Sequence, residues 1–216
     1  MFDTAYFLAW VLVFVFGTSL QKFCQAFVAN RLGDPSSANK GRLTLNPLVH
    51  HEPLGLVFGF LLSVNYPAVA WGKPLELNNF RLRGGRLGRV LVAAIGPLTF
   101  LVVAFLLWIA SKGYILGVSR SDFVAKLLVD IIQVALILCA FNLIPIYPFD
   151  GYEIIKSILP ADWEPRLQWV EQYGILILVV LVLILPFFLQ VNILFRFYVS
   201  PIVNALANLL GIGINL

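Results

Sequence analysis

The sequence FNLIPIYPFDG, residues 141–151, lies at the end of an apolar run of membrane-spanning length and carries a carboxylate at Asp150. Pro145 and Pro148 stop regular helix here, and Gly151 permits a sharp turn after Asp150. A carboxylate near membrane depth is costly and usually needs a partner. The stretch therefore indicates a broken helix end that carries a site, although an interfacial helix stop with a solvated Asp150 would fit the same residues.

The composition places this stretch in a membrane protein. The chain has 216 residues, of which 60% are hydrophobic and 12% charged, whereas a soluble domain carries about 25% charged residues. Apolar runs of about 20 residues recur, and in lipid such runs must satisfy their own backbone hydrogen bonds as helices. We predict an all-α polytopic membrane protein, a bundle of about 5–6 transmembrane helices.

This bundle is predicted to form a single membrane domain over residues 1–216. Its full spans are expected at about 4–30, 90–110, 123–144, 173–190 and 193–212. The apolar run 54–66 is too short for an ordinary span and is expected to be a re-entrant or hairpin element, or a short span. The polar segment 67–89 is expected to be a loop with short strands.

Basic residues lie between the apolar runs, as the positive-inside rule expects, so the net charge of +4 indicates membrane orientation and not nucleic-acid binding. If the N-terminus is outside and 54–66 does not span, one side holds ten basic residues: Arg31, Lys40, Arg42, Lys73, Arg81, Arg83, Arg86, Arg89, Lys156 and Arg166. The other side holds four: Lys112, Arg120, Lys126 and Arg196. This predicts an integral protein of the bacterial cytoplasmic (inner) membrane with most loops cytoplasmic. The arginine-rich loop 81–89 is expected to determine topology, with binding of anionic lipid head groups as the alternative.

Asn142-x-x-Pro145-x-x-Pro148-x-Asp150-Gly151 resembles the NxxPxxPxDG motif of the site-2 proteases, the M50 intramembrane metallopeptidases. Further segments resemble the same family in the same order: Arg31–Pro35, Gly41–His50, Pro53–Gly55, Trp71–Pro74, Asn79–Arg81 and Gly96–Pro97. The resemblance extends over essentially the whole chain. It implies a zinc hydrolase inside the bilayer, with an HExxH helix and the later aspartate as the third metal ligand.

The HExxH position falls on the segment Gln21-Lys22-Phe23-Cys24-Gln25. Glutamine replaces both histidines and is a poor zinc ligand beside imidazole, while lysine replaces the glutamate general base. The lysine cation would also repel a divalent metal. The sequence therefore predicts no intact catalytic group and no zinc, with Gln21, Lys22, Gln25, Asn142 and Asp150 as remnants of the site.

We hypothesise that the Lys22 ammonium replaces the zinc charge and forms an ion pair with Asp150. Gln21 and Gln25 would then donate hydrogen bonds to the same carboxylate or to Asn142. A buried carboxylate without a cation is strained or protonated, which favours the pair. In the alternative, Lys22 extends to an interface and Asp150 is solvated.

A different metal site is also conceivable on this chain. Cys24, Asp150 and either His50 or His51 could together hold a metal ion. The alternative is that Cys24 is a small packing residue and that the two histidines hydrogen-bond the loop beside Asn46.

The sequence predicts a catalytically inactive site-2 protease homologue, a pseudoprotease, that acts as a structural or accessory subunit of a membrane protein complex. Its expected partners are the lipid bilayer and other transmembrane proteins or a partner transmembrane helix. One alternative is a regulatory pseudoprotease that binds single-pass transmembrane substrates. Another is an intramembrane metallopeptidase with a residual or alternative metal site. A further alternative is that the glutamines and the lysine are changes introduced into an active parent.

Overall fold

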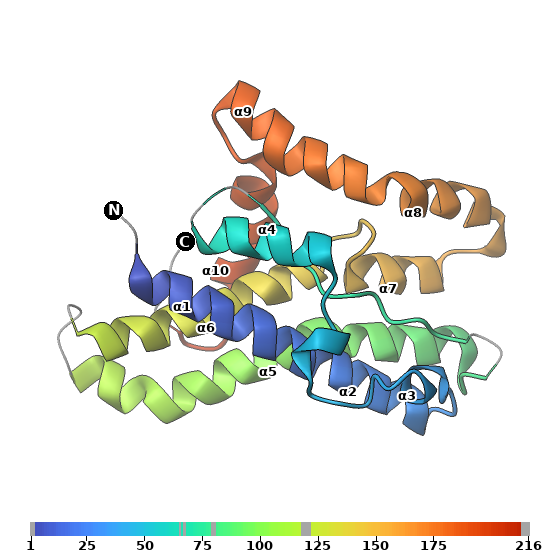
Figure 1. Ribbon diagram of the computed structural model, residues 1–216, viewed down its shortest axis with the longest axis horizontal. Coiled ribbons are helices and arrows are strands. Elements are labelled where there is room, and N and C mark those ends of the chain that lie inside the picture. Colours follow the sequence, from blue (N-terminus) through green and yellow to red (C-terminus); the bar gives the residue numbers. More distant parts are fainter. Residues whose placement is uncertain (1–2, 65, 67, 79–80, 118–121, 213–216) are drawn as a thin grey trace.

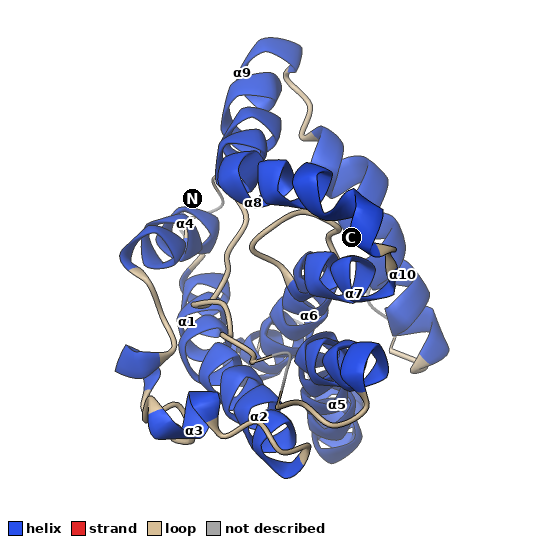
Figure 2. Ribbon diagram, turned by 90° about the vertical axis from the view of Figure 1, so that its right-hand side faces the viewer, coloured by secondary structure: helices blue, strands red, loops and turns tan. Residues whose placement is uncertain are grey.

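A computed structural model describes residues 3–64, 66, 68–78, 81–117 and 122–212. Within these residues every regular element is helical (Figures 1 and 2). The helices are α1 (Thr4–Leu12), η1 (Val13–Gly17), α2 (Thr18–Arg31), α3 (Ser36–Asn39), η2 (Pro47–Val49), α4 (Pro53–Ser63), α5 (Gly85–Gly117), α6 (Phe123–Asn142), α7 (Asp150–Ile158), η3 (Ala161–Trp163), α8 (Glu164–Val179), η4 (Val180–Ile184), α9 (Leu185–Leu189), η5 (Phe195–Val199) and α10 (Ser200–Leu209).

The all-α membrane bundle predicted from the sequence is confirmed. Four helices of the described chain are long and apolar enough to cross a membrane: Thr4–Arg31, Gly85–Gly117, Phe123–Asn142 and Pro165–Leu189. The first is a continuous run of α1, η1 and α2. The last predicted span, 193–212, contains the 5-residue η5 and the 10-residue α10, and it is not among the four.

The short element predicted at 54–66 is the single helix α4, not a hairpin. It has 11 residues and so extends about 16 Å, roughly half of the hydrocarbon core. Pro53 in its first turn has a φ angle already suited to a helix start. The described part of the chain contains no strand, so the short strands expected within 67–89 are absent from the residues that are described there.

The centre of the bundle is α6, which packs against α1, α5 and α10. Its second half is almost completely buried, and the Phe141 ring lies 6.5 Å from both Trp10 and Phe149. Residues 68–71, between α4 and α5, are also buried, although they have no regular structure. In this segment Trp71 packs against Phe58 and Phe149, so the loop passes through the core.

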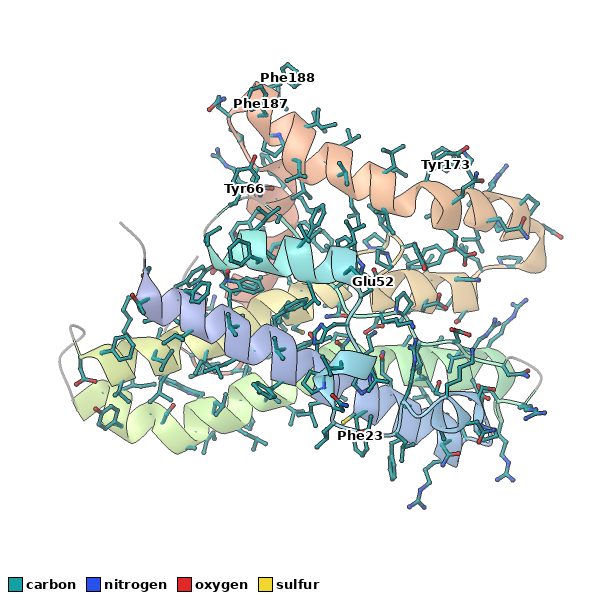
Figure 3. The ribbon with its side chains drawn as sticks, viewed as in Figure 1. Phe23, Glu52, Tyr66, Tyr173, Phe187 and Phe188 are labelled. Atoms are coloured by element: carbon teal, nitrogen blue, oxygen red, sulfur yellow. The ribbon has the colours of Figure 1, made fainter. Side chains whose placement is uncertain are left out.

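The helical run α8, η4 and α9 lies along one edge of the molecule, with α4 and α7 between it and the layer of α2 and α5 (Figures 1 and 2). It is the least buried of the four candidate spans: 22% of its most apolar window is buried, against 56% for α6. Phe187 and Phe188 at its end point away from the bundle (Figure 3). Most of this helix therefore faces lipid or a partner.

The arginine-rich loop lies at one end of the bundle. The end of α2, the start of α5 and the turn between α7 and α8 lie at the right-hand end in Figure 1, whereas the end of α5 and the start of α6 lie at the left. The arginine-rich loop is therefore at the same end as the last residue of α2, Arg31. Arg120 of the predicted opposite side lies outside the described residues, as do Asn79 and Phe80 of the family-like segment.

Candidate functional site

The inward face of α2 is polar, which is unusual for a helix at membrane depth. Gln21, Lys22 and Gln25 are exposed by 1, 2 and 1% respectively. Phe23, between them in sequence, lies on the outer side of the helix (Figure 3). Since residues three and four apart share a helix face, the replaced HExxH positions point together into the protein.

Asp150 and Asn142 approach this face from the two sides of the proline-containing turn. Asp150 is the first residue of α7 and Asn142 the last of α6. The Asn142 amide nitrogen donates to the Leu138 carbonyl oxygen at 2.7 Å, which leaves the amide oxygen directed at the site. A Cβ atom at Gly151 would lie 2.4 Å from the Leu143 carbonyl oxygen, so the turn needs glycine at this position.

The third wall of the site is α5, where glycine and proline have separate effects. Pro97 has no N–H, so the Ala93 carbonyl oxygen lacks its usual helix donor. The Gln25 amide nitrogen lies 3.5 Å from that oxygen and donates to it. At Gly96 a Cβ atom would lie 1.7 Å from Asp150 Oδ2, so the absence of a side chain makes room for the carboxylate.

These walls meet in a hydrogen-bonded network around the carboxylate. Lys22 Nζ lies 3.3 Å from Asp150 Oδ1 and 3.1 Å from Gln25 Oε1. Gln21 Nε2 donates to Asp150 Oδ2 at 2.6 Å and to Asn142 Oδ1 at 2.8 Å. The structure thus brings together all five remnant residues predicted from the sequence, and both carboxylate oxygens of Asp150 have donors.

The side chains at this site do not suit a divalent zinc ion. The groups that face Asp150 are an ammonium and an amide N–H, which are donors and cannot ligate a metal. The Lys22 ammonium lies 3.3 Å from Asp150 Oδ1 and would repel a divalent cation there. Lys22 also stands at the position where the family motif has the glutamate general base. The positive charge of Lys22 and the negative charge of Asp150 instead balance each other inside the protein, with the amide side chains as hydrogen-bond partners.

The structure does not assemble the alternative metal site. In the described part of the chain no three His, Cys, Asp or Glu side chains are close enough to hold an ion. His50 is fully buried, and its Nε2 lies 2.7 Å from the Thr44 carbonyl oxygen. His51 Nε2 lies 3.1 Å from the carbonyl oxygen of Val15 in η1. His50 therefore hydrogen-bonds the loop that contains Asn46, as expected, whereas His51 hydrogen-bonds the first span and not that loop.

A small cavity of about 20 Å³ lies beside Asp150. Its lining residues come from α2, α5, α7 and the loops: Gln25, Pro74, Leu75, Leu77, Val92, Ala93, Tyr147, Pro148, Asp150 and Glu153. Burial raises the pKa of Glu153 above its usual 4.5. The sequence analysis missed this second carboxylate, although its place three residues after Asp150 on α7 puts it on the same helix face.

Known proteins are similar to this chain in sequence over most of its length. The chain is 31% identical over 182 residues to the Bacillus subtilis (strain 168) protein "Putative zinc metalloprotease YwhC", a match that covers 79% of this chain and 78% of that protein. It is 29% identical over 175 residues to "Putative zinc metalloprotease Rip2" of Mycolicibacterium smegmatis, and 29% identical over 170 residues to the Mycobacterium tuberculosis (H37Rv) protein of the same name. The match covers 62% of each Rip2 protein.

No protein-family model matches the chain, and no solved structure is a significant match. The relatedness to YwhC over most of both chains is sufficient to define the family. The chain is an integral membrane protein that belongs to the site-2 protease family.

Proposed function

We propose that this chain is a catalytically inactive site-2 protease homologue that serves as a structural or accessory subunit of a membrane protein complex. The observation that carries the proposal is the Lys22–Asp150 ion pair, with an Nζ–Oδ1 distance of 3.3 Å and side-chain exposures of 3 and 8%. At the position where the family binds its metal, the ammonium group of Lys22 supplies a positive charge for Asp150 in place of the metal. The chain is accordingly expected to contain no zinc.

The network around Asp150 supports a structural role. Its donors and acceptors belong to α2, α5, α6 and α7, so the ion pair and its amide partners link four helices. Inside a membrane, interhelical hydrogen bonds contribute to packing where the hydrophobic effect between helices is weak. A site with these bonds holds the bundle together and needs no substrate to do so.

The exposed run from α8 to α9 supports a partner in the membrane. A helix with 22% of its apolar window buried offers a long face to another transmembrane helix. We propose that other transmembrane proteins bind there and that the protein resides in a bacterial cytoplasmic membrane, with the arginine-rich end of the bundle on the cytoplasmic side.

The test is the mass and composition of the assembly purified from its native membrane in mild detergent, together with its zinc content. A discrete assembly with other proteins in a fixed ratio and without zinc would support the proposal. A chain that purifies alone or as a homo-oligomer would contradict the subunit role. Variable, substoichiometric capture of single-pass proteins would favour the regulatory pseudoprotease instead. Bound zinc that is lost in Asp150→Ala would favour a metallopeptidase.

A further inference from the structure

Four exposed arginines lie at one end of the bundle, where α2 ends and α5 begins. They are Arg31, Arg81, Arg83 and Arg86, and we call them the arginine cluster. Among the side chains that the structure describes, every ion pair uses a lysine. The carboxylate that interacts with Arg81 is Asp34, which is fully buried and whose oxygens accept hydrogen bonds from the Ser36 and Asn78 backbone N–H groups. Four exposed positive charges against one buried carboxylate leave a net positive site for an anion at the membrane surface.

Backbone contacts hold the cluster together. The Arg83 N–H donates to the Leu32 carbonyl oxygen at 2.7 Å, which attaches the loop before α5 to the end of α2. Gly33 adopts a φ of 95°, and a Cβ there would lie 3.2 Å from the Arg81 carbonyl oxygen and 3.4 Å from Arg83 Cγ. The Arg83 side chain therefore lies against the turn that follows Arg31.

After the arginine cluster, α5 has an exposed apolar stripe along one side. Leu87, Leu91 and Leu98 are exposed by 73, 56 and 48%. The spacings of four and seven residues place them within about 40° of one another around the helix axis. Exposed Val102, Phe105 and Ile109 continue the same side of α5. A basic surface above an apolar stripe matches a molecule with an anionic head and an aliphatic tail.

We propose that the arginine cluster binds the phosphate head group of an anionic phospholipid whose acyl chain lies along Leu87 and Leu91. Guanidinium groups suit this role because they bind phosphate oxygens through paired N–H donors and stay charged at all physiological pH values. If the positive charge served only to orient the protein in the membrane, net charge at this end would be enough. Arginines held in a fixed arrangement next to an apolar stripe would not be needed. The lipid site would be the same whether or not the chain is a protease.

The test is native mass spectrometry of the full chain in detergent with equal amounts of dioleoylphosphatidylglycerol and dioleoylphosphatidylcholine. We expect the wild type to carry more phosphatidylglycerol. Arg83→Gln/Arg86→Gln should reduce that preference by about fivefold or more, because each basic residue near an anionic head group contributes about that factor. The matched control Lys112→Gln/Arg196→Gln removes the same charge from exposed residues without acidic partners among the described side chains.

Three outcomes would overturn the proposal: no preference in the wild type, an equal loss in the control variant, or displacement of the lipid by millimolar glycerol phosphate. The last would indicate a site for free phosphate, since glycerol phosphate has no acyl chain. A second measurement uses the wild type alone, with a phosphatidylglycerol that carries a photoreactive group in its acyl chain. Cross-links should concentrate on α5 near Leu87 and Leu91, and cross-links confined to other helices would contradict the site.

Discussion

Lys22 on α2 and Asp150 on α7 are 128 residues apart in sequence, and their charged atoms lie 3.3 Å apart in the core of the bundle. Each is surrounded by protein, so the free energy of each charge depends on the other. A buried pair of this kind is a weak source of net stability, but the loss of one partner leaves an uncompensated charge.

Replacement of Lys22 should therefore be much more harmful than replacement of both partners. We expect Lys22→Met to lower the free energy of unfolding by about 3–5 kcal/mol, because the Asp150 carboxylate would remain buried without its cation. The double variant Lys22→Met/Asp150→Asn should recover most of that loss. Thermal unfolding in detergent measures both, and equal stability of the wild type and the single variant would contradict the coupling.

Gly96 tests the close packing of α5 against the site. Gly96→Ala would place Cβ 1.7 Å from Asp150 Oδ2, so the helices must separate or the carboxylate must leave its donors. We expect a strongly destabilised protein that loses its monodisperse peak in size-exclusion chromatography. Gly113→Ala on the same helix is the control, because its Cβ would have nothing within 4 Å and alanine favours helix. Similar behaviour of the two variants would argue against the packing described here.

Restoration of the family motif should create a zinc site. In Gln21→His/Lys22→Glu/Gln25→His, two imidazoles would replace the two glutamine amides of the site. The amide nitrogen of Gln21 already lies 2.6 Å from Asp150 Oδ2. We expect about one zinc per chain in the variant by elemental analysis, since two histidines and a carboxylate form a typical catalytic zinc site. The wild type should bind none.

Its control is the same triple variant with Asp150→Ala, which should lose most of the metal. Zinc in the wild type, or zinc in the triple variant that does not depend on Asp150, would contradict the proposal that the Lys22–Asp150 network stands in place of the family's zinc site.

The two histidines should make stability depend on pH. Burial lowers the pKa values of His50 and His51 below 6.5, against the opposing hydrogen bonds to the Thr44 and Val15 carbonyls. The native histidines stay neutral where the unfolded chain takes up protons, so stability should fall as the pH decreases from about 7 to 5. Glu153 acts in the opposite direction because its pKa is raised.

The variant His51→Gln isolates one of these contributions, since every other titrating group is unchanged. We expect a smaller difference in melting temperature between pH 7.5 and pH 5 in the variant than in the wild type. A difference of the same size would show that His51 does not titrate between the folded and unfolded states.

The sequence by itself determined the membrane class, the approximate positions of the long helices and the family. These follow from local properties: the length of each apolar run fixes what can cross a bilayer, and the order of short motifs identifies relatives. The loss of the metal ligands was also visible, because each replaced position could be counted from Arg31 along a single helix. The free-energy cost of burying a carboxylate at membrane depth was enough to suggest that Asp150 has a cationic partner.

Tertiary structure decided the features that depend on contacts between distant segments. It determined that Gln25 bonds the Ala93 carbonyl freed by Pro97, and that Gly96 leaves space for Asp150. It also determined that residues 68–71 cross the core without forming a strand and that α4 is a single short helix. Neither hydropathy nor spacing specifies which backbone groups meet across helices, because those contacts form only when the helices pack together.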